Sequence, residues 1–180
     1  MIAGSLARRY ARALLDIGVA KGSFEELGKE MDDLAAAYSA SRDLAEALTN
    51  PVFPMAKRRA VLESVLDKAH VSPVTKNFVL LLLERERMPY LPAIARELRV
   101  MVDERAGRVR ATLTSARPLP AEHVAGVQAA LEKSTGKKVV LEKKEDPALI
   151  GGVVAKVGDV VYDGTVRTQL ELMRERFLAH

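Results

Sequence analysis

The hydrophobic pattern of this chain changes its period at Gly107, and that change is the strongest limit on its fold. Before Gly107, apolar residues recur at intervals of three and four, which is typical of amphipathic helices. From Arg108 to Thr114, polar and apolar residues alternate, which is typical of a half-buried strand. The sequence therefore predicts a helical half over residues 1–106 and a mixed α/β half over residues 107–180.

Six helices are expected in the first half, because caps, prolines and glycines separate six segments of helical periodicity. Ser5 is expected to cap the first helix, and Ser23 with Glu26 has the spacing of a capping box at the second. Ser72, followed by proline, is expected to cap the fifth. The approximate ranges of the six helices are 5–19, 23–38, 42–49, 54–69, 73–87 and 90–106. We expect them to form a six-helix bundle.

The fourth of these helices begins with a basic triplet, Lys57, Arg58 and Arg59. Its inner side is expected to be apolar and to consist of Ala60, Val61, Leu62, Val65, Leu66 and Ala69. We therefore expect the basic triplet to lie on a solvated face.

The first and fifth helices carry more apolar surface than an ordinary surface helix, whose apolar stripe covers about 100°. On the fifth, only Asn77 and Glu84 mark a polar edge beside the apolar run of residues 78–83. On the first, the apolar residues are Ala3, Leu6, Ala7, Tyr10, Ala11, Ala13, Leu14, Leu15 and Ile17. Two hypotheses explain this surface: the two helices pack on each other in the centre of the bundle, or a partner helix lies between them.

The second half is expected to have the element order β-α-β-β-β-α. Gly151 and Gly152 precede an apolar run, which indicates a positive φ or a close backbone approach. A turn at Gly158-Asp159 is expected to join two strands, and Val166, Leu170, Met173 and Phe177 have helical spacing after them. The expected strands are 108–114, 139–141, 153–157 and 160–162, and the expected helices are 120–136 and a last one from about 164.

The sequence offers no recognisable catalytic or metal site. It has no cysteine, and His70, His123 and His180 have no metal-ligand spacing between them. Gly151-Gly152 does not fit a phosphate-binding glycine motif, since no helix is expected to follow it. We therefore expect neither enzymatic activity nor a cofactor, and the longest apolar run, residues 78–83, is too short to span a bilayer.

A nucleic-acid-binding protein is the alternative to an interaction protein. The net charge is +4, and Lys137, Lys138, Lys143 and Lys144 surround one expected strand. The expected strands contain Tyr162 as their one aromatic residue, whereas platforms for single-stranded RNA stack bases on aromatic side chains. An edge strand guarded by lysines is the interpretation that we favour for this cluster.

The chain resembles the delta subunit of bacterial F-type ATP synthase, called the oligomycin-sensitivity-conferring protein in mitochondria. Residues 146–159, Asp-Pro-Ala-Leu-Ile-Gly-Gly-Val-Val-Ala-Lys-Val-Gly-Asp, followed by Asp-Gly-Thr-Val-Arg at 163–167, are similar to the signature of that family. Residues 7–14, Ala-Arg-Arg-Tyr-Ala-Arg-Ala-Leu, resemble its first helix, and the junction from Gly107 to Leu119 also matches. The resemblance covers essentially the whole chain.

This resemblance implies an N-terminal six-helix bundle, residues 1–106, and a small α/β domain, residues 107–180. It implies a non-catalytic subunit of the peripheral stalk, which links the catalytic head to the b subunits and resists rotor torque during proton-driven ATP synthesis. The bundle would bind the N-terminal helix of an alpha subunit, and the second domain would contact the C-terminal region of b. The chain would bind no nucleic acid and would lie at the cytoplasmic face of the inner (plasma) membrane, attached only through the complex.

The resemblance also implies that the alpha helix is received between the first and fifth helices. The contact residues would be Ala7, Tyr10, Ala11, Leu14, Asn77, Phe78, Leu81 and Leu82. We expect Phe78→Asp or Ala11→Glu to weaken that binding without unfolding the bundle.

Overall fold

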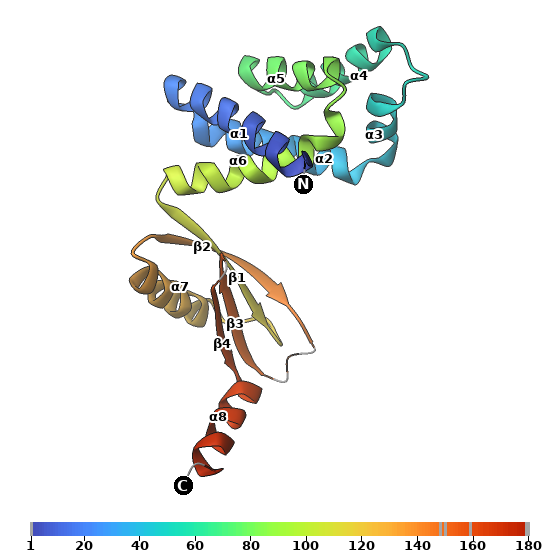
Figure 1. Cartoon of the computed structure of the whole chain (residues 1–180). Helices are drawn as coiled ribbons and strands as arrows, with labels where there is room; N and C mark the ends of the chain where they lie inside the picture. The colour runs from blue at the N-terminus through green and yellow to red at the C-terminus, as the bar shows by residue number, and fades with distance from the viewer. Residues whose placement is uncertain (1, 148, 150, 159, 179–180) are drawn as a thin grey trace. The chain divides into compact units, whose positions relative to one another are not determined.

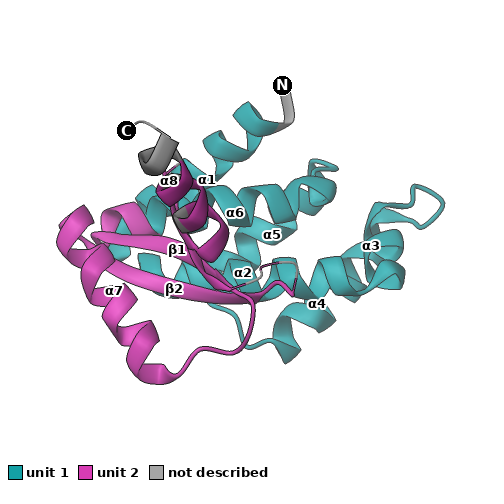
Figure 2. Cartoon of the chain, turned by 90° about the horizontal axis from the view of Figure 1, so that it is seen from below, with its two compact units in different colours: residues 1–102 teal, residues 103–180 magenta. Residues whose placement is uncertain are grey.

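The computed structural model describes the backbone of residues 2–147, 149, 151–158 and 160–178. Side chains are described for these residues except 2, 3, 169, 172 and 175–178, so the expected roles of Ala3 and Phe177 lie outside the description. The chain divides into two compact units, residues 1–102 and 103–180, which Figure 2 shows in two colours. We refer to them as the helical unit and the small unit.

The helical unit contains the elements α1 to α6 (Figure 1), which follow the predicted order. The bounds are α1 Ile2–Lys21, α2 Phe24–Ala40, α3 Arg42–Thr49, α4 Met55–Lys68, α5 Pro73–Glu84, a 3₁₀ turn Met88–Tyr90 and α6 Leu91–Arg105. Buried side chains from all six α-helices join one hydrophobic core, and the largest fully buried ones include Leu14, Met31 and Ile94. The apolar periodicity of the sequence is therefore satisfied inside this unit.

Polar contacts connect the helices around that core. Arg99 Nε on α6 donates to Asp32 Oδ2 on α2 at 2.7 Å. At the start of α5, Ser72 N and Ser72 Oγ both donate to the carboxylate of Glu30 on α2, at 2.8 and 2.7 Å. Ser72 Oγ also accepts from Thr75 N, so the predicted cap of α5 forms. The negative charge of Glu30 lies at the positive end of the α5 dipole, which favours this arrangement.

The predicted start of the first helix is wrong, and the second helix begins as predicted but without the expected capping box. Helix α1 begins at Ile2, so Ser5 lies inside it, and Ser23 makes no side-chain cap bond to α2. The amide of Ser23 donates to Gly18 O at 2.9 Å, which closes the end of α1. This bond occupies the amide that Glu26 would need in a capping box, and it holds Ser23 at a ψ of 24°, away from the extended N-cap conformation.

Two further differences concern α4 and α5. In α4 the inner stripe is Arg58, Leu62 and Leu66. Contrary to the prediction, Ala60, Val61 and Ala69 are exposed. Helix α5 ends at Glu84, earlier than the predicted Arg87. The reason is a Schellman turn, in which Glu86 takes a φ of +55° while Arg87 N donates to Leu82 O at 2.7 Å.

The small unit is a four-stranded mixed sheet with two helices, so the predicted mixture of helices and strands is confirmed. The strand order is β2-β1-β3-β4, with β1 parallel to β2 and antiparallel to β3. Strand β2 is longer than predicted because it pairs with β1 at every position from Arg108↔Lys138 to Ser115↔Glu145. The bounds are β1 Arg108–Ser115, α7 Ala121–Thr135, β2 Lys138–Glu145, β3 Gly152–Val157, β4 Val160–Thr165 and α8 Val166–Leu178.

Helix α7 covers one face of this sheet (Figure 1). Val124 and Leu131 on α7 are buried in one core with Ala111, Leu113 and Val139 of the strands. Successive strand residues point to opposite faces, so the residues between them lie on the face that α7 does not cover. Because β2 is an edge strand, its lysines fit the predicted protection of a sheet edge.

Gly152 begins β3 in a conformation that explains why the sequence has glycine there. Its φ is +87°, and a Cβ at this position would lie 2.3 Å from Gly164 O and 2.8 Å from Thr165 Cα. Gly152 pairs with Thr165, so the close approach joins β3 to the end of β4. The predicted close backbone approach is therefore confirmed at Gly152.

We expect Gly152→Ala to lower the free energy of unfolding of the small unit by about 3 kcal/mol, because the new Cβ adds both backbone strain and a steric clash. Hydrogen exchange of the β3 and β4 amides measures this loss separately from the helical unit. Gly126→Ala in α7 is the matched control, since a Cβ there meets no atom within 4 Å. The control should stabilise α7 by about 0.5–1 kcal/mol, and equal effects of the two substitutions would contradict the role of Gly152.

Candidate partner-binding surfaces

The eight residues predicted to contact a partner helix lie on α1 and α5, but they differ in burial. Phe78 is largely buried, and Asn77, Tyr10 and Leu81 reach the surface, with Leu81 40% exposed. Four of the eight are fully enclosed in the core: Ala7, Ala11, Leu14 and Leu82. The apolar arc of each helix is therefore divided between the core and the surface.

Burial contradicts the expectation that Ala11→Glu and Phe78→Asp would leave the unit folded. Ala11 is 0% exposed, and Phe78 belongs to the same core. A carboxylate at either position would be buried without a partner charge, which is strongly destabilising. Exposed positions are needed to test binding at these helices.

Tyr10 joins α1 to α5. Its ring meets that of Phe78 edge to face, with the ring centroids 6.1 Å apart. Arg87 Nη1 donates to Tyr10 Oη at 3.0 Å, and the guanidinium carbon of Arg87 lies 5.4 Å from the centroid of the Tyr10 ring. Contacts with Phe78 on α5 and with Arg87, just after α5, thus hold the Tyr10 side chain in one orientation.

We define the α1–α5 surface by Tyr10, Ile17, Asn77 and Leu81. Tyr10 and Ile17 are seven residues apart in α1 and therefore lie on the same side of it, two turns from one another. Ile17 is exposed, although it was predicted only as part of the apolar arc and not as a contact residue. Its exposure, rather than its residue type, distinguishes it from Leu14.

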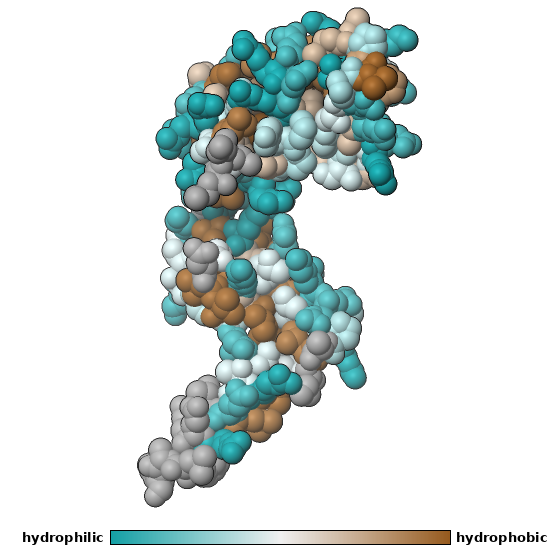
Figure 3. Space-filling view, turned by 45° about the vertical axis from the view of Figure 1, so that its right-hand side comes forward, coloured by the Kyte–Doolittle hydropathy of each residue, from teal (hydrophilic) through white to brown (hydrophobic). Residues whose placement is uncertain are grey.

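Helix α8 carries the second exposed apolar surface. Val166, Leu170 and Met173 are all exposed, and Leu170 has 61% of its surface accessible. Their spacing of four and three places them along one side of the helix. Figure 3 shows hydrophobic residues beside hydrophilic ones on this helix. We call these three residues the α8 surface.

The start of α8 is fixed by an acidic side chain. Asp163 Oδ1 accepts from Thr165 N at 2.8 Å, and Asp163 Oδ2 accepts from Thr168 Oγ1 at 2.8 Å. These hydrogen bonds, first that from the Thr165 amide, lower the pKa of the Asp163 carboxyl below its ordinary value. Thr165 Oγ1 in turn accepts from Thr168 N at 3.3 Å, so the first turn of α8 is capped.

The uncovered face of the sheet does not have the features of a nucleic-acid platform. Tyr162 pairs with the buried Ala155 and lies on the face covered by α7, where its hydroxyl is 3.4 Å from Ser134 Oγ. Arg110 on the uncovered face forms ion pairs with Asp103 and, at 3.5 Å, with Glu142. Tyr162, the single aromatic residue of the strands, therefore lies on the face opposite Arg110, and the charge of Arg110 is compensated by Asp103 and Glu142.

Two further properties concern the described part of the chain. Within it, no group of three or more His, Asp or Glu side chains is arranged to hold a metal ion. His180 lies outside the described residues. None of the described helices combines the length and the apolar character that crossing a membrane requires.

A helical unit followed by a small α/β unit, each with apolar side chains exposed on a helix, is the construction of a protein that acts through contacts with other chains. Residues 6–177 match the model of a family described as the ATP synthase delta (OSCP) subunit. The match spans nearly the whole chain, and the chain belongs to this family.

The chain is similar to curated relatives over nearly their whole length. Proteins named ATP synthase subunit delta from Geobacter sp. (strain M21) and Anaeromyxobacter sp. (strain Fw109-5) are 41% and 43% identical to this chain, over 97% and 98% of both sequences. The protein of the same name from Myxococcus xanthus (strain DK1622) is 43% identical over 97% of both. The predicted family resemblance is confirmed.

A solved structure supports the fold. A chain in the cryo-EM structure of the Toxoplasma gondii mitochondrial ATP synthase hexamer aligns with a TM-score of 0.68, over 97% of this chain and 98% of its own, at 23% identity. Members of the delta (OSCP) family are structural stator subunits rather than catalytic ones, and a role in the peripheral stalk of ATP synthase fits this chain.

We expect the cap at Asp163 to make α8 sensitive to acid. Because the folded-state pKa is lowered, the carboxylate stabilises the folded state above its unfolded pKa of about 3.9, and this contribution is lost as the pH falls through the folded-state pKa. Asp163→Asn retains a cap without a titrating group, so its acid transition should lack this component. Hydrogen exchange of the α8 amides between about pH 6 and pH 3 measures the difference, and identical pH profiles would rule out this role.

Proposed function

We propose that this chain links the N-terminal helix of an alpha subunit in the catalytic head to the C-terminal region of the b subunits. In this proposal the six α-helices form the bundle that binds the head, and the small unit contacts b. The complex attaches the chain to the cytoplasmic face of the plasma membrane. The link keeps the head stationary while the rotor turns during proton-driven ATP synthesis.

The observation that carries the proposal is that α1 and α5 each have some apolar side chains in the core and others on the surface. The inner sides of both helices are fixed in one core, so their exposed residues are presented on a rigid support. Tyr10 and Leu81 add an aromatic and an aliphatic side chain, which are typical anchors for an amphipathic helix. This arrangement supports a helix-binding role for the α1–α5 surface.

The buried members of the predicted contact set have an indirect role in this proposal. Ala7 and Ala11 have small side chains that allow a close approach to α1 within the core. Leu14 and Leu82 fill the interior below the surface. We therefore assign direct contact to Tyr10, Asn77 and Leu81, with the edge of Phe78, and a supporting position to the other four.

The α8 surface is the proposed contact for the b subunit. Its three apolar residues are exposed along one side of a helix whose start is capped by Asp163 and Thr165. A helix with this much exposed apolar surface is expected to gain stability from a partner. The b subunit is the partner that the sequence resemblance implies for the small unit.

A stator must resist torque, so its contacts need to dissociate slowly. Affinity differences among variants of one interface arise mainly in the off-rate. Buried apolar contacts keep their strength at physiological salt, whereas exposed ion pairs are screened. Two apolar helical surfaces are therefore suited to this task.

For the head, we expect Leu81→Asp to weaken binding of a synthetic peptide with the sequence of the alpha N-terminal segment by about tenfold or more, through a faster off-rate. Leu81 is exposed, so the helical unit should stay folded. Calorimetric titration of the full chain measures the affinity. Val52→Asp, at an exposed apolar residue between α3 and α4, is the control and should bind as the wild type does. Equal affinity of Leu81→Asp and wild type would exclude this surface.

For the stalk, we expect Leu170→Glu to weaken binding of the b C-terminal region by about tenfold. Surface plasmon resonance with the full chain measures the association and dissociation rates. The loss of affinity should come mainly from a faster off-rate. Val140→Glu is the matched control, because Val140 is an exposed apolar residue on the uncovered face of the sheet. A loss of binding in Val140→Glu with none in Leu170→Glu would move the b contact from α8 to the sheet.

A further inference from the structure

Arg58 is buried where the sequence predicts a solvated residue. Only 7% of its surface is exposed, whereas its neighbour Arg59 is exposed. Arg58, Leu62 and Leu66 are four residues apart and form the inner stripe of α4. A guanidinium group, which is always charged, therefore occupies a position at which periodicity calls for an apolar side chain.

The charge of Arg58 is poorly compensated within the described structure. Its Nε atom is buried and has no hydrogen-bond partner there. The carboxylate closest to it belongs to Glu86, with 4.0 Å between Arg58 Nη2 and Glu86 Oε1, and the Glu86 side chain is itself 73% exposed. Arg59, by contrast, pairs with Glu63 at 3.0 Å and with Glu84 at 3.1 Å. The more exposed arginine has two close partners, and the buried one has a single distant one.

A cavity of about 200 Å³ lies beside Arg58. The end of α3, the loop after it and the segment after α5 supply its other walls. Apolar contributions come from Leu48, Pro51, Met88 and Pro89, and Thr49 adds a hydroxyl. That hydroxyl donates to Ala45 O at 2.7 Å, so its oxygen is left as an acceptor. The cavity therefore combines one buried cation with mainly apolar walls.

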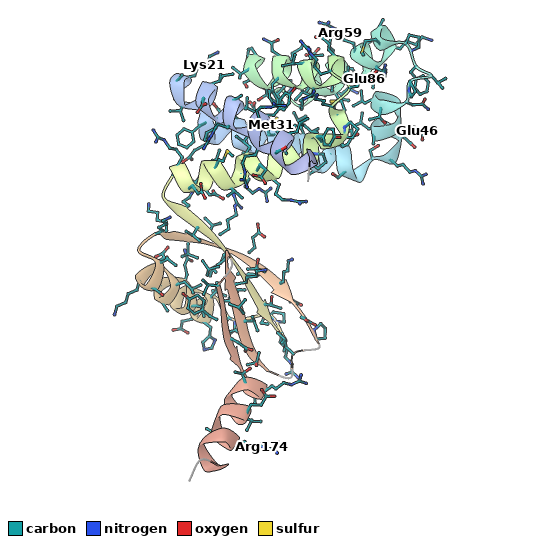
Figure 4. All side chains as sticks on the ribbon, viewed as in Figure 1. Lys21, Met31, Glu46, Arg59, Glu86 and Arg174 are labelled. Carbon is teal, nitrogen blue, oxygen red and sulfur yellow. The ribbon has the colours of Figure 1, made fainter. Side chains whose placement is uncertain are left out.

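Glu86 lies at this cavity in a backbone conformation that usually favours glycine. It has a φ of +55° in the Schellman turn that ends α5. Its exposed side chain can move into solvent at little cost. Figure 4 labels Glu86 and Arg59, which lie on the side of the helical unit formed by α4 and α5. Glu86 thus places a negative charge near Arg58, but its side chain does not fill the cavity.

We propose that this cavity binds a carboxylate group through Arg58. The planar guanidinium matches a carboxylate in a two-point hydrogen bond. A buried cation without close partners is costly, and an incoming carboxylate would remove that cost. The volume corresponds to roughly six or seven water molecules, which suits an acidic side chain or a short-chain acid. Glu86 disfavours a phosphate dianion more than a monoanion, because like charges repel.

The carboxylate has two sources: a free small acid, or an Asp or Glu side chain of another subunit of the complex. The cavity uses none of the residues of the α1–α5 and α8 surfaces. Its occupation by a free acid therefore does not depend on the stator role proposed above. Two experimental arms distinguish the sources.

The first arm titrates the ¹⁵N-labelled full chain with blocked glutamate, N-acetylglutamate amide, at low salt. The expected result is a saturable shift of the Arg58 Nε–Hε resonance, with a dissociation constant on the order of millimolar. Blocked glutamine, which has the same shape without the charge, should cause no saturable shift. Arg58→Lys should weaken binding by about tenfold through loss of the two-point contact, and Glu86→Gln should tighten it about two- to fivefold.

The second arm compares the wild-type chain with Arg58→Met in binding to the remaining subunits of the ATP synthase. Methionine fills the position with an uncharged side chain, and a thermal melt confirms that the variant folds. A loss of about tenfold or more, with no effect of blocked glutamate, assigns the cavity to a partner carboxylate. The proposal fails if neither arm depends on Arg58. Tighter binding of inorganic phosphate than of blocked glutamate would overturn the carboxylate assignment.

Discussion

Burial of α1 and α5 in a single apolar core is the constraint on which the helical unit depends. Ala11 and Leu14 of α1 and Leu82 of α5 are enclosed, so these helices are fixed before any partner binds. The same helices carry Tyr10, Ile17 and Leu81 on their outer sides. A surface built on such helices has little conformational freedom to lose on binding, and preorganisation of this kind favours affinity.

Much of the fold could be predicted, because periodicity, prolines and glycines act locally. The change at Gly107, the cap at Ser72 and the backbone approach at Gly152 were all visible in the sequence. The capping box expected at Ser23 does not form, because the Ser23 amide bonds to Gly18 O in the preceding helix. Arg58 was misplaced for a different reason: its residue type indicates solvent, while its position in the α4 stripe indicates the core.

The candidate contact residues were only partly predictable. A wide apolar arc shows that a helix has more than one apolar neighbour, but it does not show which part of the arc faces the core. Ala11 and Leu14 faced inward, and Ile17, in the same arc, faced solvent. On α8 the spacing of Val166, Leu170 and Met173 predicted a shared side of the helix. Whether that side of α8 is exposed depends on how the helix packs against the sheet. The local sequence pattern does not contain this information.

The central place of β1 in the sheet has a consequence for biosynthesis. Strand β1 pairs with β2 on one side and with β3 on the other, so its first partner strand is complete at Glu145 and its second only at Val157. The helical unit has its own core within residues 1–102 and precedes all of these strands. On the ribosome, the helical unit can therefore fold while β1 is still unpaired, and the small unit completes its sheet last.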